Sequence, residues 1–133
     1  TAANRQPIGV VVLETAGRSE ALRRVFNAEW FAEQAPIVLC VCALPAEGYR
    51  RKDGKSFVHV DATIAMDHLI LAATNEGLGT CWIAAFDPVA AREVFGLPEG
   101  VEPVVLTPLG YPSDTAGAKL RKTKEQLVHW GRW

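Results

Sequence analysis

The stretch that decides the fold runs from Asp61 to Pro112: DATIAMDHLILAATNEGLGTCWIAAFDPVAAREVFGLPEGVEPVVLTPLGYP. Its first part carries apolar residues at the i, i+3, i+4, i+7 spacing of one helical face, namely Ala62, Ala65, Met66, Leu69, Ala72 and Ala73. Asp61 can cap the first turn, and Gly77 can take the left-handed conformation that ends a helix. We therefore predict a helix from Asp61 to Gly77. Because Ile64 and Leu71 add apolar surface elsewhere on it, we expect it to be buried in a core or between subunits.

The rest of the stretch predicts two strands and a second helix. The run Thr80–Ile83 predicts a short buried strand. Asp87-Pro88 is typical of a helix start, because the aspartate can cap the helix and proline suits the first turn. Gly96 ends that helix, and the apolar, β-branched run Val101–Leu109 predicts a central strand.

Residues outside this stretch supply the remaining elements. Apolar runs at 8–13 and 37–43 predict strands, and helical spacing predicts a helix over 18–29 between them. The polar, basic segment 46–56 predicts an exposed loop, and the polar tail includes a short helical piece at 124–129. This order of elements suggests a sheet flanked by helices. A Rossmann dinucleotide-binding unit is rejected, because the turn after the first strand holds a single glycine.

Composition limits the class of protein. A chain of 133 residues predicts one domain over 1–133, and 49% hydrophobic residues are enough for a core. The net charge of −1 argues against nucleic acid as a partner. No apolar run approaches the roughly 18 residues of a membrane span, and no secretory signal is present. We therefore expect a cytoplasmic protein that binds neither nucleic acid nor membrane.

The residues alone offer no catalytic constellation. The three histidines lie in different elements, and no Ser/His/Asp arrangement has a suggestive spacing. Cys40 and Cys42 would face the same side of a strand, and their spacing fits neither a CxxC redox pair nor a zinc knuckle. We interpret them as small buried hydrophobes and expect no metal site. This pattern fits an enzyme whose cofactor does the chemistry, and it fits a non-enzyme equally well.

Several segments follow one another in a specific order. The helix DATIAMDHLILAA is followed by GLGTCWI and then by LPEGVEPVVLTPLGYP. Asn4-Arg5-Gln6-Pro7 precedes the first strand, and Leu120-Arg121-Lys122 lies near the end of the chain. Together these segments resemble the nitroreductase family of flavin-dependent NAD(P)H oxidoreductases, whose Asn-x-Gln-Pro segment and C-terminal basic motif they match. The resemblance covers nearly the whole chain.

The resemblance implies a fold and an activity. The fold is α+β: a mixed sheet flanked by helices, in an intertwined homodimer with the flavin at the interface. The activity is electron transfer from NAD(P)H to a nitroaromatic or quinone-type acceptor by a ping-pong mechanism. We expect FMN and not FAD as the cofactor, because no second nucleotide-binding motif is visible.

The resemblance also implies the flavin contacts, which are Asn4, Arg5, Gln6, Ile83, Ala84, Ala85, Gly110, Arg121 and Lys122. The amides of Asn4 and Gln6 can both donate and accept, which suits the polar edge and ribityl chain of a flavin. In an extended segment Arg5 would point to the opposite side. Arg121 and Lys122 could neutralise a phosphate. The alternative for each group is ordinary: a solvated N-terminal segment and a solvated basic tail.

The remaining implied contacts are made by backbone. The segment of Ile83, Ala84 and Ala85 faces the reactive side of the flavin in the family, with one N–H directed at N5. Gly110 lies on the family's Gly-Tyr-Pro turn, where a role as a turn residue is equally satisfactory. The basic run 49–52 could attract the phosphates of NAD(P)H, although charged loops are more often solvated surface.

Two departures from the family pattern motivate rival hypotheses. Relatives carry an opening helix with an Arg-x-Ser-x-Arg motif that holds the flavin phosphate, and no such motif stands in this sequence. Relatives also often have glycine where this chain has Ala84. The first rival is a redox-inactive flavin-binding or structural dimer of the same fold. The second is a related flavin enzyme with a different reaction, such as dehalogenation or flavin fragmentation.

Overall fold

A four-stranded sheet lies at the centre of the computed structural model, which describes residues 1–26, 34–113 and 117–133. The strand order is β1-β2-β4-β3, and the strands are β1 (Ile8–Glu14), β2 (Ile37–Ala43), β3 (Gly79–Thr80) and β4 (Glu102–Gly110). The predicted α+β class is confirmed. The expected mixed sheet is not found in the described chain, because all three pairings are antiparallel. The chain leaves β1 at Glu14 and re-enters the sheet beside it at Ile37, which makes the two strands antiparallel.

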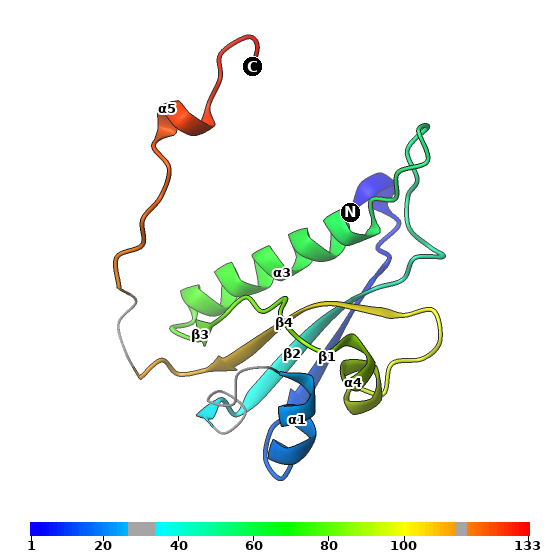
Figure 1. The fold of residues 1–133 in the computed structure, drawn as a ribbon, viewed down its shortest axis with the longest axis vertical. Coiled ribbons are helices and arrows are strands. Elements are labelled where there is room, and N and C mark those ends of the chain that lie inside the picture. Colours follow the sequence, from blue (N-terminus) through cyan, green and yellow to red (C-terminus); the bar gives the residue numbers. More distant parts are fainter. Residues whose placement is uncertain (27–33, 114–116) are drawn as a thin grey trace.

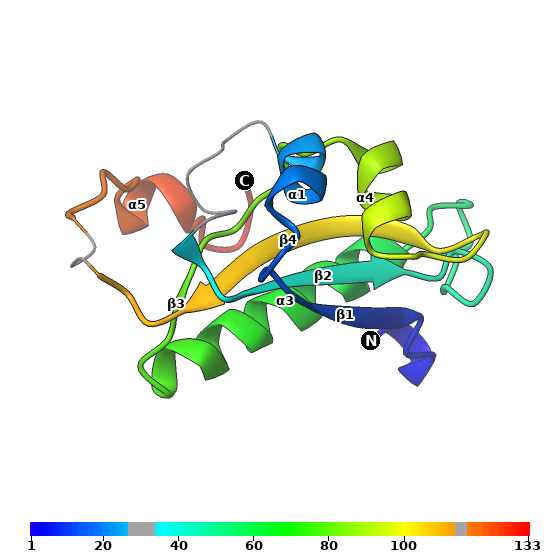
Figure 2. The same cartoon turned by 90° about the horizontal axis from the view of Figure 1, so that it is seen from below.

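Helices cover both faces of this sheet. The helices of the described chain are η1 (Ala2–Asn4), α1 (Ser19–Val25), α3 (Val58–Asn75), α4 (Pro88–Val94) and α5 (Lys124–Leu127), and α1, α3 and α4 are the ones that lie on the sheet (Figure 2). Figure 2 shows α3 on one face of the sheet and α1 with α4 on the other. The helix predicted over 18–29 is shorter than expected: α1 ends at Val25, and residues 27–33 lie outside the described chain.

Alternating side chains of β2 divide the core into two parts. Cys40 and its neighbours two residues away face α1 and α4, in a buried cluster of Leu22, Val25, Phe26, Val38, Cys40, Cys42, Ala90, Ala91, Phe95 and Leu106. Val41 faces α3, in a smaller buried cluster of Val41, Ala62, Met66 and Val105. The period of two along the strand thus supplies apolar side chains to both faces.

Helix α3 begins three residues before the predicted start. Its N-cap is Phe57, and Asp61 does not cap the helix, since the carboxylate accepts from the backbone of Ala2 instead. The predicted end is confirmed: Gly77 has a φ of 75° and donates to the carbonyl of Thr74. The expected burial on all sides is not found within the chain, where α3 buries one face and leaves others exposed.

The strand predicted at 80–83 is shorter and less buried than expected. β3 covers two residues, and only Ile83 continues the pairing, through a bridge to Leu106. Cys81 and Trp82 are exposed because this segment is an edge of the sheet, covered by β4 on one side alone. The other predictions in this stretch are confirmed: Asp87 caps α4 by accepting from two backbone N–H groups, and β4 is a central strand.

The last described segment, residues 117–133, extends away from the sheet (Figure 1). We call it the C-terminal arm. Its predicted helical piece is found as α5, and every arm residue is exposed. Leu120, Trp130 and Trp133 are 101%, 87% and 98% exposed, so the chain leaves large apolar groups uncovered here. Within the described ranges, no helix has the length and apolarity needed to cross a membrane.

Candidate functional site

The predicted amide contacts lie on a tight turn and not on an extended segment. Asn4 ends the short helix η1, and both Asn4 and Gln6 have a φ of 53°. Gln6 Nε2 donates to Asn4 Oδ1 at 3.0 Å, and both residues are exposed. The turn therefore brings the two amides side by side. An extended strand would also have put them on one side, so this part of the prediction does not depend on the turn. Their outer donor and acceptor atoms remain available for a polar ligand.

Arg5 links this turn to the loop that precedes α3. Its Nη1 donates to the carbonyl of Gly48 at 3.2 Å, in the polar segment 46–56 that precedes α3 and that we call the basic loop. Gly48 is buried, and an added Cβ would lie 3.0 Å from Cβ of Val58. The N-terminal turn, the basic loop and the start of α3 thus meet at one end of the molecule.

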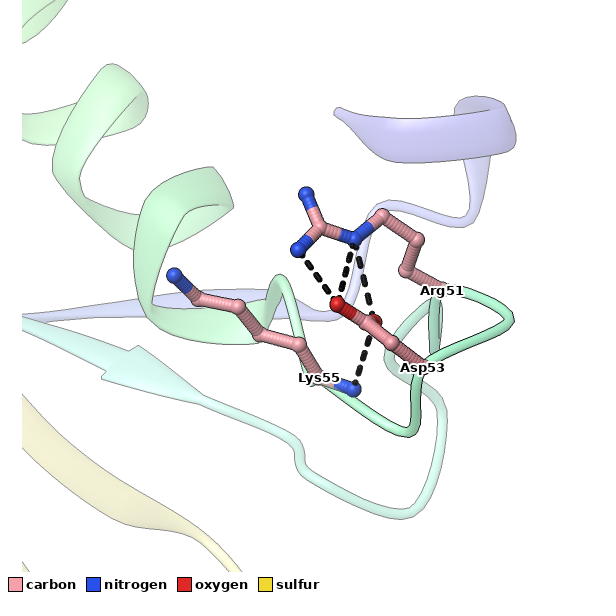
Figure 3. Close-up of polar contacts among 3 residues, drawn as sticks. All are labelled: Arg51, Asp53 and Lys55. Carbon is pink, nitrogen blue, oxygen red and sulfur yellow. Dashed lines mark hydrogen bonds and ion pairs between the residues drawn. The ribbon is translucent and has the colours of Figure 1, made fainter.

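The basic loop presents its charges partly neutralised. Asp53 accepts from Arg51 Nε at 3.0 Å and from Arg51 Nη2 at 2.5 Å, and its Oδ1 accepts from the backbone N–H of Lys55 at 3.2 Å (Figure 3). The Arg51 guanidinium, and secondarily the Lys55 N–H, lower the pKa of the Asp53 carboxyl below its ordinary value. The guanidinium also lies 5.4 Å above the centre of the Phe57 ring. This arrangement fixes Arg51 in place, whether or not the loop meets a phosphate.

The predicted backbone contacts lie along the outer edge of β4. The N–H and the carbonyl of Ile83 both pair with Leu106, at 2.9 and 3.0 Å. Ala84 and Ala85 follow as exposed residues, and within the described chain their N–H groups have no acceptor. Two adjacent free N–H donors can donate to an electron-rich ring nitrogen or oxygen, such as those of a flavin. In this respect the residues fit the group.

The position of residues 81–85, which we call the edge segment, depends on a residue that the sequence did not single out. Thr107 is fully buried in β4, and its Oγ1 accepts from the N–H of Cys81 at 3.0 Å while donating to the carbonyl of Pro108. The hydroxyl thus holds the start of the edge segment against β4. A threonine within the apolar run Val101–Leu109 was the available signal.

Gly110 has a packing role that explains its identity. It is the last residue of β4, and an added Cβ would lie 2.8 Å from Cδ of Pro36. Tyr111 beside it is 87% exposed. The glycine is thus accounted for without a ligand.

Arg121 and Lys122 are not brought to the other predicted contacts within this chain. Both are exposed on the C-terminal arm, which in Figure 1 runs apart from the N-terminal turn. Arg121 Nη1 donates only to the neighbouring carbonyl of Leu120 in the described chain. Among the described residues, no acidic side chain therefore pairs with either cationic group.

The two strand cysteines belong to the core. Cys40 and Cys42 are 0% and 1% exposed, with their Sγ atoms 3.5 Å apart. The hydrogen bond with Cys42, together with burial, raises the pKa of the Cys40 thiol, so this thiol is held in its unreactive protonated form. The interpretation as small buried hydrophobes agrees with this burial. Among the described residues, no group of three or more His, Cys, Asp or Glu side chains could hold a metal ion.

Comparison with solved structures identifies the fold. The chain superposes on a nitroreductase family protein from Clostridium difficile with a TM-score of 0.86 and 29% identity. The match covers 100% of this chain and 78% of the other.

Comparison with known sequences gives two informative relatives. An NADH dehydrogenase from Thermus thermophilus is 26% identical, over 96% of this chain and 77% of the relative. An FMN reductase (NADPH) from Bacillus subtilis is 32% identical, over 53% of this chain and 29% of the relative. Residues 16–111 match the model of the nitroreductase family, a span that includes the free N–H groups beside β4 and most of the sheet. This chain therefore belongs to the nitroreductase family.

Proposed function

We propose that this protein is an FMN-dependent oxidoreductase that passes electrons from NAD(P)H to nitroaromatic or quinone-type acceptors. Family membership supports this, as do the relatives named NADH dehydrogenase and FMN reductase (NADPH). Residues 1–133 would act as one flavin-binding domain. The reaction would take place in the cytoplasm, where NAD(P)H is available and thiols such as Cys40 and Cys42 stay reduced.

The observation that carries the proposal is the pair of free backbone N–H groups at Ala84 and Ala85. Bound FMN would supply hydride acceptance from NAD(P)H and electron delivery to the acceptor. The edge segment beside β4 would hold the ring edge by donating hydrogen bonds from a backbone that is already fixed. Asn4 and Gln6 would orient the polar side of the cofactor, and Arg121 with Lys122 would neutralise its phosphate.

Two copies of the chain would complete one site. Asn4 leads into β1 and Ala84 follows β3, at opposite edges of the four-stranded sheet. At the usual spacing between strands these edges lie about 14 Å apart. In the homodimer that we propose, the N-terminal turn of one copy would lie beside the edge segment of the other.

Uncovered apolar surface supports the same assembly. Ile64 and Leu71 on α3 are 42% and 61% exposed, and Val12 on β1 is 61% exposed. The C-terminal arm adds Trp130 and Trp133, which are 87% and 98% exposed. Surfaces of this kind on one small domain are typical of interfaces. In the proposed intertwined dimer, the arm of each copy would lie on its partner.

One open face would serve the nicotinamide and the acceptor in turn, so ping-pong kinetics are expected. The test is direct. Purified protein should be yellow, heat should release FMN identifiable by chromatography, and NAD(P)H oxidation should depend on an added nitroaromatic or quinone. A colourless protein that FMN cannot reconstitute would refute the proposal.

The alternative is a redox-inactive flavin-binding or structural dimer. The missing Arg-x-Ser-x-Arg motif and Ala84 motivated it; of these, Ala84 is not among the described residues with positive φ, so its methyl group requires no change of backbone. A redox-inactive flavin-binding dimer predicts bound FMN without NAD(P)H turnover, and a structural dimer predicts no bound FMN. Stopped-flow reduction of the yellow protein by NADH and by NADPH would separate the redox-inactive dimer from the proposed enzyme.

A further inference from the structure

The N-terminal turn is the most strained backbone in the described chain. Ala3, Asn4 and Gln6 have φ values of 52°, 53° and 53°, and they are the only non-glycine residues there in the left-handed region. L-residues adopt this region rarely. Such strain persists only where surrounding contacts enforce it, and it concentrates at functional sites. Contacts with other residues must therefore hold the turn, which carries two of the proposed flavin contacts.

The strongest of these contacts comes from Asp61. Its Oδ1 accepts from the backbone N–H of Ala2 at 2.7 Å, and the side chain is 2% exposed. Other hydrogen bonds assist it: the N–H of Gln6 donates to Thr1 Oγ1 at 3.0 Å, Arg5 reaches the Gly48 carbonyl, and three backbone hydrogen bonds join residues 1–8 to one another. The side-chain groups of these bonds, on Thr1 and Arg5, belong to exposed residues, whereas the Asp61 carboxylate is buried and its hydrogen bond is charge-assisted.

Stability alone does not account for Asp61. Its Oδ2 is buried with no hydrogen-bond partner in the described chain. A buried carboxylate with an unused oxygen has a desolvation cost, and an apolar residue beside Ala62 would avoid it. What the carboxylate provides is one directed hydrogen bond that joins the rigid helix α3 to the N-terminal turn.

We propose that Asp61 is a positioning residue for the flavin site. From the first turn of α3 it fixes Ala2, and through Ala2 it keeps Asn4 and Gln6 in the strained conformation that pairs their amides. The cofactor then meets a preformed donor and acceptor set and does not have to order the turn itself. This inference rests on the proposed function.

Variants can remove the hydrogen bond from either side. Asp61→Ala removes the acceptor, and Asp61→Asn keeps an Oδ1 that accepts. Ala2→Pro removes the donor and leaves the sequence of α3 unchanged, and proline suits the first position of a helix such as η1. Met66→Ala is the control, since it weakens the buried face of α3 away from the turn. Ala2→Pro decides the question if Asp61→Ala does not fold.

The first measurement is amide hydrogen exchange at residues 4–6 without added FMN. We expect it to be about tenfold or more faster in Asp61→Ala and Ala2→Pro, and unchanged in Met66→Ala and Asp61→Asn. The second is the FMN dissociation constant from flavin fluorescence. It should rise about tenfold in the first two variants and stay within about threefold in Asp61→Asn.

Each other outcome is decisive. Unchanged exchange in Ala2→Pro would overturn the inference, as would a loss of FMN affinity in Met66→Ala equal to that in Asp61→Ala. If the unmodified protein binds FMN and Ala2→Pro binds it equally tightly, only the inference fails. If the unmodified protein binds no FMN, the proposed function fails, and the role of Asp61 at a flavin site fails with it.

Discussion

The two faces of the sheet are covered to different degrees. On one face, α1 and α4 pack on β2 and β4 and seal a cluster of ten buried residues. An ion pair between Arg24 and Glu93 also links these two helices. On the other face, α3 is the only helix of the described chain that covers the sheet, over four buried residues, and Ile64, Leu71 and Val12 stay exposed. The first face is closed by this chain itself, and we infer that the second is closed by another copy.

The largest expected effect tests the open face. Leu71→Asp would place a charge where the second copy buries it without a partner, at a cost of about 3–5 kcal/mol, or more than a hundredfold in the dissociation constant of the dimer. Sedimentation velocity would measure this, and flavin should be lost with the dimer. Val89→Asp is the control, because Val89 on α4 is similarly exposed but lies on the closed side. Equal dissociation in both variants would contradict the assigned interface.

The closed face should respond through folding and not through assembly. Leu22→Ala removes a fully buried side chain of α1 and should lower the free energy of unfolding by about 2–5 kcal/mol. Urea titration followed by circular dichroism measures this. At low denaturant the variant should retain the association state of the unmodified protein. A dimer that dissociates while each chain stays folded would show that α1 and not α3 lies near the interface.

The C-terminal arm offers an intermediate effect. Arg121→Ala should weaken FMN binding by about 1.5–3 kcal/mol, because charge-assisted hydrogen bonds to a phosphate are lost. Lys119→Ala, on the same arm, removes the same charge and should change affinity by about twofold at most. Flavin fluorescence titration compares the two. Equal dissociation constants would mean that the arm does not bring Arg121 to the phosphate.

The smallest effect concerns the basic loop at the start of α3. Asp53→Asn frees Arg51, so if the loop attracts coenzyme phosphates, KM for NADPH should fall about two- to threefold at low salt and less at high salt. A KM that does not change at either salt concentration would identify the loop as solvated surface.

The same ion pair has a defined pH range. Because the pKa of Asp53 is lowered from its ordinary 3.8, the pair contributes above that pH and is lost as the pH falls through the folded-state value. Nuclear magnetic resonance titration of the Asp53 carboxyl should find its midpoint below 3.8. A midpoint at or above 3.8 would show that Arg51 does not hold the carboxylate.

Much of the fold could be predicted because its signals are local. Periodicity predicted β2, β4 and the buried face of α3, and the Asp87-Pro88 pair predicted the start of α4. These signals depend on side-chain spacing and on capping groups within one turn, so the sequence contains them directly. The segment order DATIAMDHLILAA, GLGTCWI, VVLTPLGYP was likewise enough to indicate the nitroreductase family.

What only the tertiary structure decided depends on contacts between distant residues. Asp61 was predicted to cap its own helix, yet it binds Ala2, 59 residues away in the chain. Thr107 holds the edge segment through Cys81, and Gly110 is required by Pro36. The edge position of β3 also explains why Cys81 and Trp82 are exposed where an apolar run predicted burial. Local patterns carry no information about which distant group will satisfy a buried polar atom, because that choice is made by packing.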